Sequence, residues 1–118
     1  MKKLLTVIFL FCCMATSAQE RDLKVLRAEI DSLDDALINL LDERMKVCRE
    51  VGLYKLEHNL PVVQNNRFKE ILEKRGRQGE ERGMQRKFIK RVFCNIHDES
   101  CRQQDELIKQ NKKPRRKK

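Results

Sequence analysis

The longest regular pattern in this chain is a stripe of apolar residues that recur at alternating spacings of three and four positions. Its members are Leu23, Leu26, Ile30, Leu33, Leu37, Leu40, Val47, Val51 and Tyr54, with Arg44 in the slot between Leu40 and Val47. This spacing predicts one long amphipathic helix from about residue 22 to about residue 57. Gly52 is the weak helix former within it, and we expect this glycine to allow close packing.

A stripe of this length needs another long helix to cover it. A chain of 118 residues offers only a thin core, and a strict three–four spacing is typical of helices that pack along each other. We therefore expect a homodimer in which the long helices of two copies pack together. A monomeric three-helix bundle is the alternative.

Two shorter helices are expected after the long one. The break at Asn59-Leu60-Pro61 is followed by a short apolar face, which predicts a helix over about residues 65–75. The members of this face are Phe68, Ile71 and Leu72. The glycine-rich stretch 76–83 is expected to be a loop.

A third helix is expected over about residues 84–108, with its apolar face turned inward. That face comprises Phe88, Ile89, Val92, Phe93, Ile96 and Leu107. No segment of the chain alternates between apolar and polar residues as a strand does. The sequence therefore predicts an all-α, three-helix protomer with one long N-terminal helix.

The first 18 residues are typical of a secretory signal peptide. Lys2 and Lys3 precede an apolar run that ends at Met14, and small residues follow up to Ala18. The run is too short to span a bilayer, so we expect cleavage after Ala18 and no transmembrane segment in the mature protein. The mature protein would then be exported, either periplasmic or secreted. A buried N-terminal helix is the alternative.

The formal net charge of +9 is concentrated at the two ends of the chain. Lys2, Lys3 and the seven basic residues between Lys109 and Lys118 account for all of it, so the segment between them is balanced. The predicted domain, residues 19–108, therefore has no excess positive charge, and we expect no nucleic-acid partner. Residues 109–118 are expected to be a solvated, disordered basic tail, with contact to an anionic polymer or lipid surface as the alternative.

Several polar residues occupy positions that a helical core would fill with apolar side chains. Arg44 interrupts the stripe, and a guanidinium buried without an anionic partner costs several kcal/mol. Lys55 follows eleven residues later, about 16 Å along nearly the same face. Ser100 and Gln104 share a face of the third helix. Together these residues predict an internal pocket for an anion.

Arg27 lies about 25 Å before Arg44 on the same helix and on another side of it. If it contributes to the same pocket, it must come from the other subunit. The shared pocket is therefore a prediction that depends on the dimer.

Cysteines and histidines provide no pattern of metal ligands. Cys48, Cys94 and Cys101 remain after removal of the predicted signal peptide, and the odd number leaves at least one thiol unpaired within the chain. His58 and His97 stand alone, and we expect each to be a surface or supporting residue. We expect neither a metal nor a cofactor.

The chain resembles the all-helical chorismate mutase family over residues 23 to about 104. The resemblance is carried by Leu26-Arg27-Ala28-Glu29-Ile30-Asp31-Ser32-Leu33-Asp34, Leu40-Leu41-Asp42-Glu43-Arg44, Val51-Gly52-Leu53-Tyr54-Lys55, Pro61-Val62, Arg67, and Ser100 with Gln104. It implies an intertwined homodimer of three-helix protomers that converts chorismate into prephenate.

The resemblance also implies a role for each matching residue. Arg44 and the partner subunit's Arg27 would bind the two substrate carboxylates with help from Ser100, and Arg67 would support the pocket wall or a carboxylate. Lys55 and Gln104 would donate hydrogen bonds to the ether oxygen. This set suits a unimolecular rearrangement, because the reaction needs positioning and fixed donors but no base, nucleophile or metal.

Two positions depart from the family pattern. Family members commonly carry acidic residues at the positions of Gln64 and Phe68, where they contact the ring hydroxyl of the substrate. Gln64 can still hydrogen-bond that hydroxyl, whereas Phe68 cannot and fits the apolar face of its own helix. Two alternatives therefore stay open: an isochorismate-pyruvate lyase on the same fold, and an exported helical interaction protein without catalytic activity.

Overall fold

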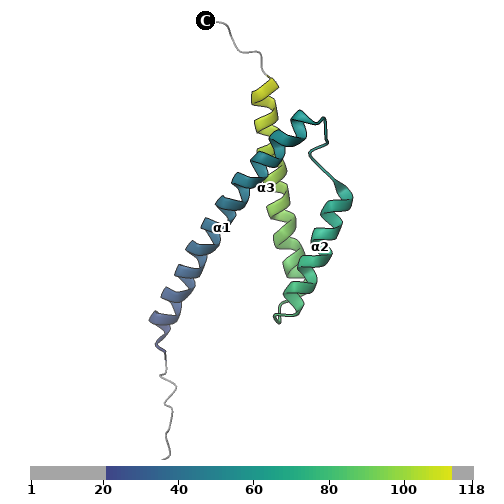
Figure 1. Cartoon of the computed structure of the whole chain (residues 1–118). Helices are drawn as coiled ribbons and strands as arrows, with labels where there is room; N and C mark the ends of the chain where they lie inside the picture. The colour runs from purple at the N-terminus through teal and green to yellow at the C-terminus, as the bar shows by residue number, and fades with distance from the viewer. Residues whose placement is uncertain (1–20, 113–118) are drawn as a thin grey trace, which may run out of the picture. The chain divides into compact units, whose positions relative to one another are not determined.

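The computed structural model describes residues 21–112, which form three helices (Figure 1). These are α1 (Leu23–Glu57), α2 (Asn65–Glu80) and α3 (Arg86–Lys112). The described range contains no strand, which confirms the all-α fold. The predicted signal peptide and residues 113–118 of the predicted tail lie outside this range and stay predictions.

The chain divides into two compact units after Asp34, within the continuous helix α1. The first unit contains Arg27 and the beginning of the apolar stripe. In this unit, Nη1 of Arg21 donates to both carboxylate oxygens of Glu29 at 2.6 Å. The second unit contains the remainder of α1 together with α2 and α3, and it holds the site described below.

Helices α2 and α3 lie side by side, joined by a short turn (Figure 1). Helix α2 continues to Glu80, so the predicted loop over residues 76–83 was mostly wrong. Gly79 is buried against α3, and a Cβ atom there would lie 2.3 Å from Cγ1 of Ile89. Gly79 therefore serves close helix packing rather than a turn. The turn itself ends at Gly83, whose φ of 77° is readily adopted only by glycine.

Helix α3 begins and ends slightly later than predicted. It runs to Lys112, so the first four residues of the predicted disordered tail are helical. Lys109 and Lys112 lie in its last turn, where cations interact favourably with the helix dipole. Phe88, which we expected to face inward, is 45% exposed. The neighbouring Ile89 faces α2, as predicted.

The second half of α1 meets α3 at Gly52. This glycine is buried, and a Cβ atom there would lie 2.8 Å from Cγ of Gln104. The expectation that Gly52 allows close packing is confirmed. This contact brings the polar residues of α1 and α3 within hydrogen-bonding distance.

The apolar stripe of α1 and the face that contacts α3 are two different faces. Leu37, Leu40 and Val47 of the stripe are each more than half exposed in the single chain. Arg44 instead faces α3, together with Met45 and Gly52. The stripe therefore stays available to a partner, as the predicted homodimer requires. None of the described helices has a segment long and apolar enough to cross a membrane.

Candidate functional site

The site is built where α1 and α3 cross, and its first component is Arg44. Nη1 of Arg44 donates a hydrogen bond of 2.9 Å to Oγ of Ser100 and lies 3.5 Å from Sγ of Cys48. These contacts use one of the two terminal nitrogens of the guanidinium. The other donors of this fork stay available to a carboxylate, which a guanidinium can bind in a bidentate manner.

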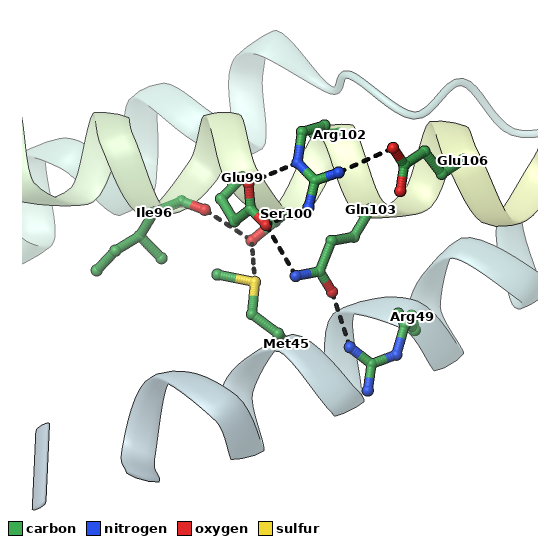
Figure 2. Close-up of polar contacts among 8 residues, drawn as sticks. All are labelled: Met45, Arg49, Ile96, Glu99, Ser100, Arg102, Gln103 and Glu106. Atoms are coloured by element: carbon green, nitrogen blue, oxygen red, sulfur yellow. Dashed lines mark hydrogen bonds and ion pairs between the residues drawn. The ribbon is translucent and has the colours of Figure 1, made fainter. Parts of the chain in front are cut away.

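Ser100 is held in place by its own helix and by α1 (Figure 2). Its hydroxyl donates to the carbonyl of Ile96 at 2.8 Å, and its Oγ lies 3.5 Å from Sδ of Met45. The side chain is 6% exposed. Because the single hydroxyl proton is directed to Ile96, the oxygen is oriented to accept from Arg44. Ser100 therefore fixes the position of the guanidinium.

Lys55 and Gln104 form the second component of the site. Nζ of Lys55 donates to Oε1 of Gln104 at 3.0 Å and to the carbonyl of Val62 at 2.7 Å. Nε2 of Gln104 donates to the carbonyl of Cys48 at 2.9 Å. Gln104 is 4% exposed. The bonds to Lys55 and Cys48 thus fix both the rotamer and the amide orientation of this glutamine.

A network on the neighbouring face of α3 supports this crossing (Figure 2). Nη1 of Arg49 donates to Oε1 of Gln103 at 2.7 Å, and Nε2 of Gln103 donates to Glu99 at 3.0 Å. The guanidinium of Arg102 binds the same Glu99 carboxylate and lowers its pKa to about 2. The Glu99 carboxylate therefore stays ionised at neutral pH.

These groups line one cavity of about 120 Å³ within the second unit. Its walls are formed by Arg44, Cys48, Lys55, Val62, Gln64, Arg67, Phe68, Ile71, His97, Ser100, Cys101 and Gln104. Six of the seven predicted site residues therefore come together, with Gln64 and Arg67 exposed at its rim. Its volume is well below the roughly 300–1,000 Å³ that is typical of a ligand pocket.

Arg27 is the remaining predicted site residue. It belongs to the first unit, whereas every residue of the cavity belongs to the second. Its contribution from the partner subunit stays a prediction.

Sequence reasoning missed an aromatic wall of this cavity. The rings of Phe68 on α2 and His97 on α3 are stacked, with centroids 3.8 Å apart and planes at 17°. Burial lowers the pKa of His97. The charge of Asp98 opposes this effect, and the charges of Arg44 and Lys55 add to it. The spacing of His97, Ser100 and Gln104 on one face of α3 is the sequence signal that could have identified it.

Cys101 lies next to this wall, with Sγ 3.6 Å from Nε2 of His97. A cysteine beside a histidine could form a nucleophilic pair. However, burial raises the pKa of the Cys101 thiol, which opposes formation of the thiolate nucleophile. The side chains of the site are therefore suited to binding and hydrogen-bond donation. Across residues 21–112, no cluster of His, Cys, Asp and Glu side chains has the makings of a metal site.

Comparison with known proteins agrees with this chemistry. Residues 26–105 match the family described as chorismate mutase type II. A 4-amino-4-deoxychorismate mutase of Streptomyces pristinaespiralis is 31% identical over 86 residues, which cover 73% of this chain and 67% of that protein. A bifunctional chorismate mutase/prephenate dehydratase of Escherichia coli K12 is 34% identical over 92 residues, which cover 78% of this chain and 24% of that protein.

A second bifunctional chorismate mutase/prephenate dehydratase, from Aquifex aeolicus, is 43% identical over 53 residues, or 45% of this chain and 15% of that protein. The chain thus spans less than a quarter of the length of these two bifunctional proteins. The family match extends over helices α1, α2 and α3 and includes every predicted site residue. The chain belongs to the chorismate mutase type II family and is an isomerase of that family.

Proposed function

We propose that this protein converts chorismate into prephenate, with Arg44, Lys55, Ser100 and Gln104 as the core of its active site. The observation that carries this proposal is the convergence of these residues from α1 and α3 in one cavity, with hydrogen-bond donors left over. In this rearrangement the ether carbon–oxygen bond breaks and a new carbon–carbon bond forms within the same molecule. No atom enters or leaves, and no proton is transferred.

The N–H groups that Lys55 and Gln104 leave unpaired indicate what these two residues do in the reaction. Nζ of Lys55 has three N–H groups, of which Gln104 and Val62 receive two. Nε2 of Gln104 has two N–H groups, of which Cys48 receives one. One N–H of each residue therefore stays free for the ether oxygen, on which negative charge grows in the transition state. Because both groups are already fixed, they need little reorganisation during the reaction.

Arg44 would bind a substrate carboxylate through the terminal nitrogen that does not contact Ser100. Arg67, at the exposed rim, would interact with the same or the second carboxylate, and Gln64 would hydrogen-bond the ring hydroxyl. Holding a flexible dianion in its compact, reactive conformation supplies much of the rate enhancement in such a reaction.

We further propose that a second copy of the chain completes the site by contributing Arg27. The small cavity and the exposed stripe residues of α1 support this proposal. Arg27→Ala and Arg44→Ala chains should each be nearly inactive alone, and heterodimers refolded from a mixture should regain activity in one of their two sites. Heterodimers that form without any activity would contradict a shared site.

We also propose that the chain is exported after removal of residues 1–18. The proposal rests on the basic, apolar and small-residue pattern of these residues. N-terminal sequencing of the protein recovered from the periplasm or medium of an expressing bacterium should begin at Gln19. A protein that keeps Met1 and stays in the cytoplasm would refute export and leave the catalytic proposal untouched.

The test of the catalytic proposal is product identification. The purified mature protein is incubated with chorismate and, separately, with isochorismate, and the products are identified by chromatography and mass spectrometry. Formation of prephenate supports the mutase. Formation of pyruvate from isochorismate alone would identify a lyase, and turnover of neither substrate would favour a non-catalytic interaction protein.

A further inference from the structure

The charges around the cavity are all of one sign. Arg44, Lys55 and Arg67 line it, and no aspartate or glutamate does so within the part of the chain that the structure describes. The acidic residue nearest to the wall in sequence is Asp98, which is exposed and follows His97 on α3. A cationic group on a ligand would therefore enter a cavity that offers three like charges and no carboxylate.

The wall formed by the Phe68–His97 stack adds no negative charge to the cavity. Phe68 contributes an apolar ring, and its stacking partner His97 is half-buried. Because burial lowers the pKa of His97 below its ordinary value of 6.5, its imidazole is mostly neutral at pH 7. A neutral imidazole can accept or donate a hydrogen bond but does not compensate a positive charge. Gln64, at the rim, is likewise neutral.

The two groups of relatives are named after two different substrates, and this wall can discriminate between them. Their names refer to chorismate and to 4-amino-4-deoxychorismate, which differ in one ring substituent: a hydroxyl in the first and an amino group in the second. An alkyl amine of this type is largely protonated at neutral pH, whereas the hydroxyl stays uncharged. An ammonium on the ring would therefore find no carboxylate among the residues that line the cavity.

We propose that the neutral wall formed by Phe68 and His97 makes this site selective for a substrate whose ring carries an uncharged hydroxyl over one whose ring carries a protonated amine. This inference rests on the proposed mutase activity and specifies its substrate class. The selectivity arises because the cavity offers the ammonium no carboxylate partner, while the positive charge of Lys55 is not paired with a carboxylate of the substrate. Like charges placed together at a binding site are strongly disfavoured.

The test compares kcat/KM for chorismate and for 4-amino-4-deoxychorismate, measured at pH 7.5 on the mature protein. We expect the aminated substrate to be at least about tenfold poorer, because it brings an unpaired positive charge to a cationic site. Equal kcat/KM values, or a preference for the amine, would overturn the inference while leaving the mutase activity intact. Absence of turnover with either substrate would instead refute the proposed function, and with it this inference.

Adding a carboxylate to the cavity should reverse part of the preference. In Phe68→Glu, the ratio of kcat/KM for the amine to that for the hydroxyl should rise about tenfold or more, because the ammonium gains a partner. Gln64→Glu provides the same test at the rim with a nearly isosteric change, in case Phe68→Glu does not fold. If both variants lower turnover of the two substrates together and leave the ratio unchanged, the wall does not set the selectivity and the inference is overturned.

Gln78→Glu is the matched control. Gln78 belongs to α2, as Phe68 does, and its Oε1 accepts a hydrogen bond from Arg75 outside this cavity. The substitution adds the same charge to the same helix and should leave the substrate ratio at the wild-type value. A ratio that rises equally in Gln78→Glu and Gln64→Glu would show a general charge effect and overturn the assignment to the wall.

Discussion

Gln104→Glu is the substitution that tests the proposed chemistry most directly. The wild-type amide accepts from Lys55 through Oε1 and donates to the Cys48 carbonyl through Nε2, which leaves one N–H for the ether oxygen. A glutamate keeps the shape of the side chain and can still accept from Lys55. When ionised, however, it has no proton to donate, so the substitution removes both N–H donors, the one to Cys48 and the one left for the ether oxygen, without leaving a cavity.

The magnitude follows from the role of that donor. Removing one preorganised donor to a developing negative charge costs about 3–4 kcal/mol, or roughly 10²–10³ in kcat. An ionised carboxylate adds repulsion toward the ether oxygen and toward the Cys48 carbonyl. Because the charge on the ether oxygen grows in the transition state, kcat should fall far more than KM rises.

Protonation of the new carboxyl group in Gln104→Glu should restore part of the lost activity at low pH. A carboxyl group regains one O–H donor when it is protonated. Burial at this position raises the pKa of the new carboxyl group, whereas Lys55 lowers it. We expect kcat of the variant to rise as the pH falls from 8 toward 5. The wild-type amide does not titrate, so the wild-type profile should be comparatively flat over the same range.

The assay is the initial rate of chorismate consumption, followed by ultraviolet absorbance from pH 5 to pH 8, with circular dichroism as a check of folding. Gln103→Glu is the control, because Gln103 contacts Arg49 and Glu99 outside the cavity. It places a carboxylate beside the ionised Glu99, so it should reduce stability and leave kcat near the wild-type value. Wild-type activity of Gln104→Glu at neutral pH, without recovery in acid, would remove Gln104 from the mechanism.

Three further predictions concern the binding of the substrate and the stability of the fold. Arg44→Ala should lower kcat/KM by the equivalent of about 2–5 kcal/mol, because one substrate carboxylate loses its hydrogen-bonded cation; near wild-type steady-state kinetics would refute the pocket assignment. Gly79→Ala should lower the free energy of unfolding by about 1–2 kcal/mol in urea titration, because overpacking against Ile89 outweighs the gain of about 1 kcal/mol in helix propensity; an increase would contradict the close α2–α3 contact. The folded pKa of His97 lies below its ordinary value of 6.5, so the unfolded chain takes up the proton first as the pH falls. Melting temperatures should therefore decrease below pH 6.5 more steeply for wild type than for His97→Gln, and parallel curves would refute this.

The sequence predicted the helices and most of the site because both depend on residue spacing along one chain. The four-residue spacing of Ser100 and Gln104 places them on one face of α3, and the structure directs both toward α1. The position of α2 was also evident from its apolar face. These features follow from local geometry, which periodicity reports directly.

Residue spacing could not predict the features that depend on how two helices pack against each other. Arg44 was expected to lie on the same face as Leu37 and Leu40, but it faces α3 while those residues are exposed. Helical spacing does not distinguish two adjacent faces that serve different neighbours. In the same way, Gly79 could indicate a turn or a close helix contact, and only Ile89 on the facing helix decides between them.

The two faces of α1 explain both the thin core of the single chain and the proposed shared site. Met45 is the single buried hydrophobic side chain in residues 21–112, although Leu37, Leu40 and Val47 lie exposed along α1. One face of α1 is thus committed to α3 and to the cavity, and the apolar face has nothing within the second unit to cover it. Burial of that face by a second copy would supply most of the missing hydrophobic stabilisation, at about 25 cal/mol per Å² of apolar surface. It would also bring another Arg27 into the assembly, so that the contact needed for stability is the one that the proposed chemistry requires.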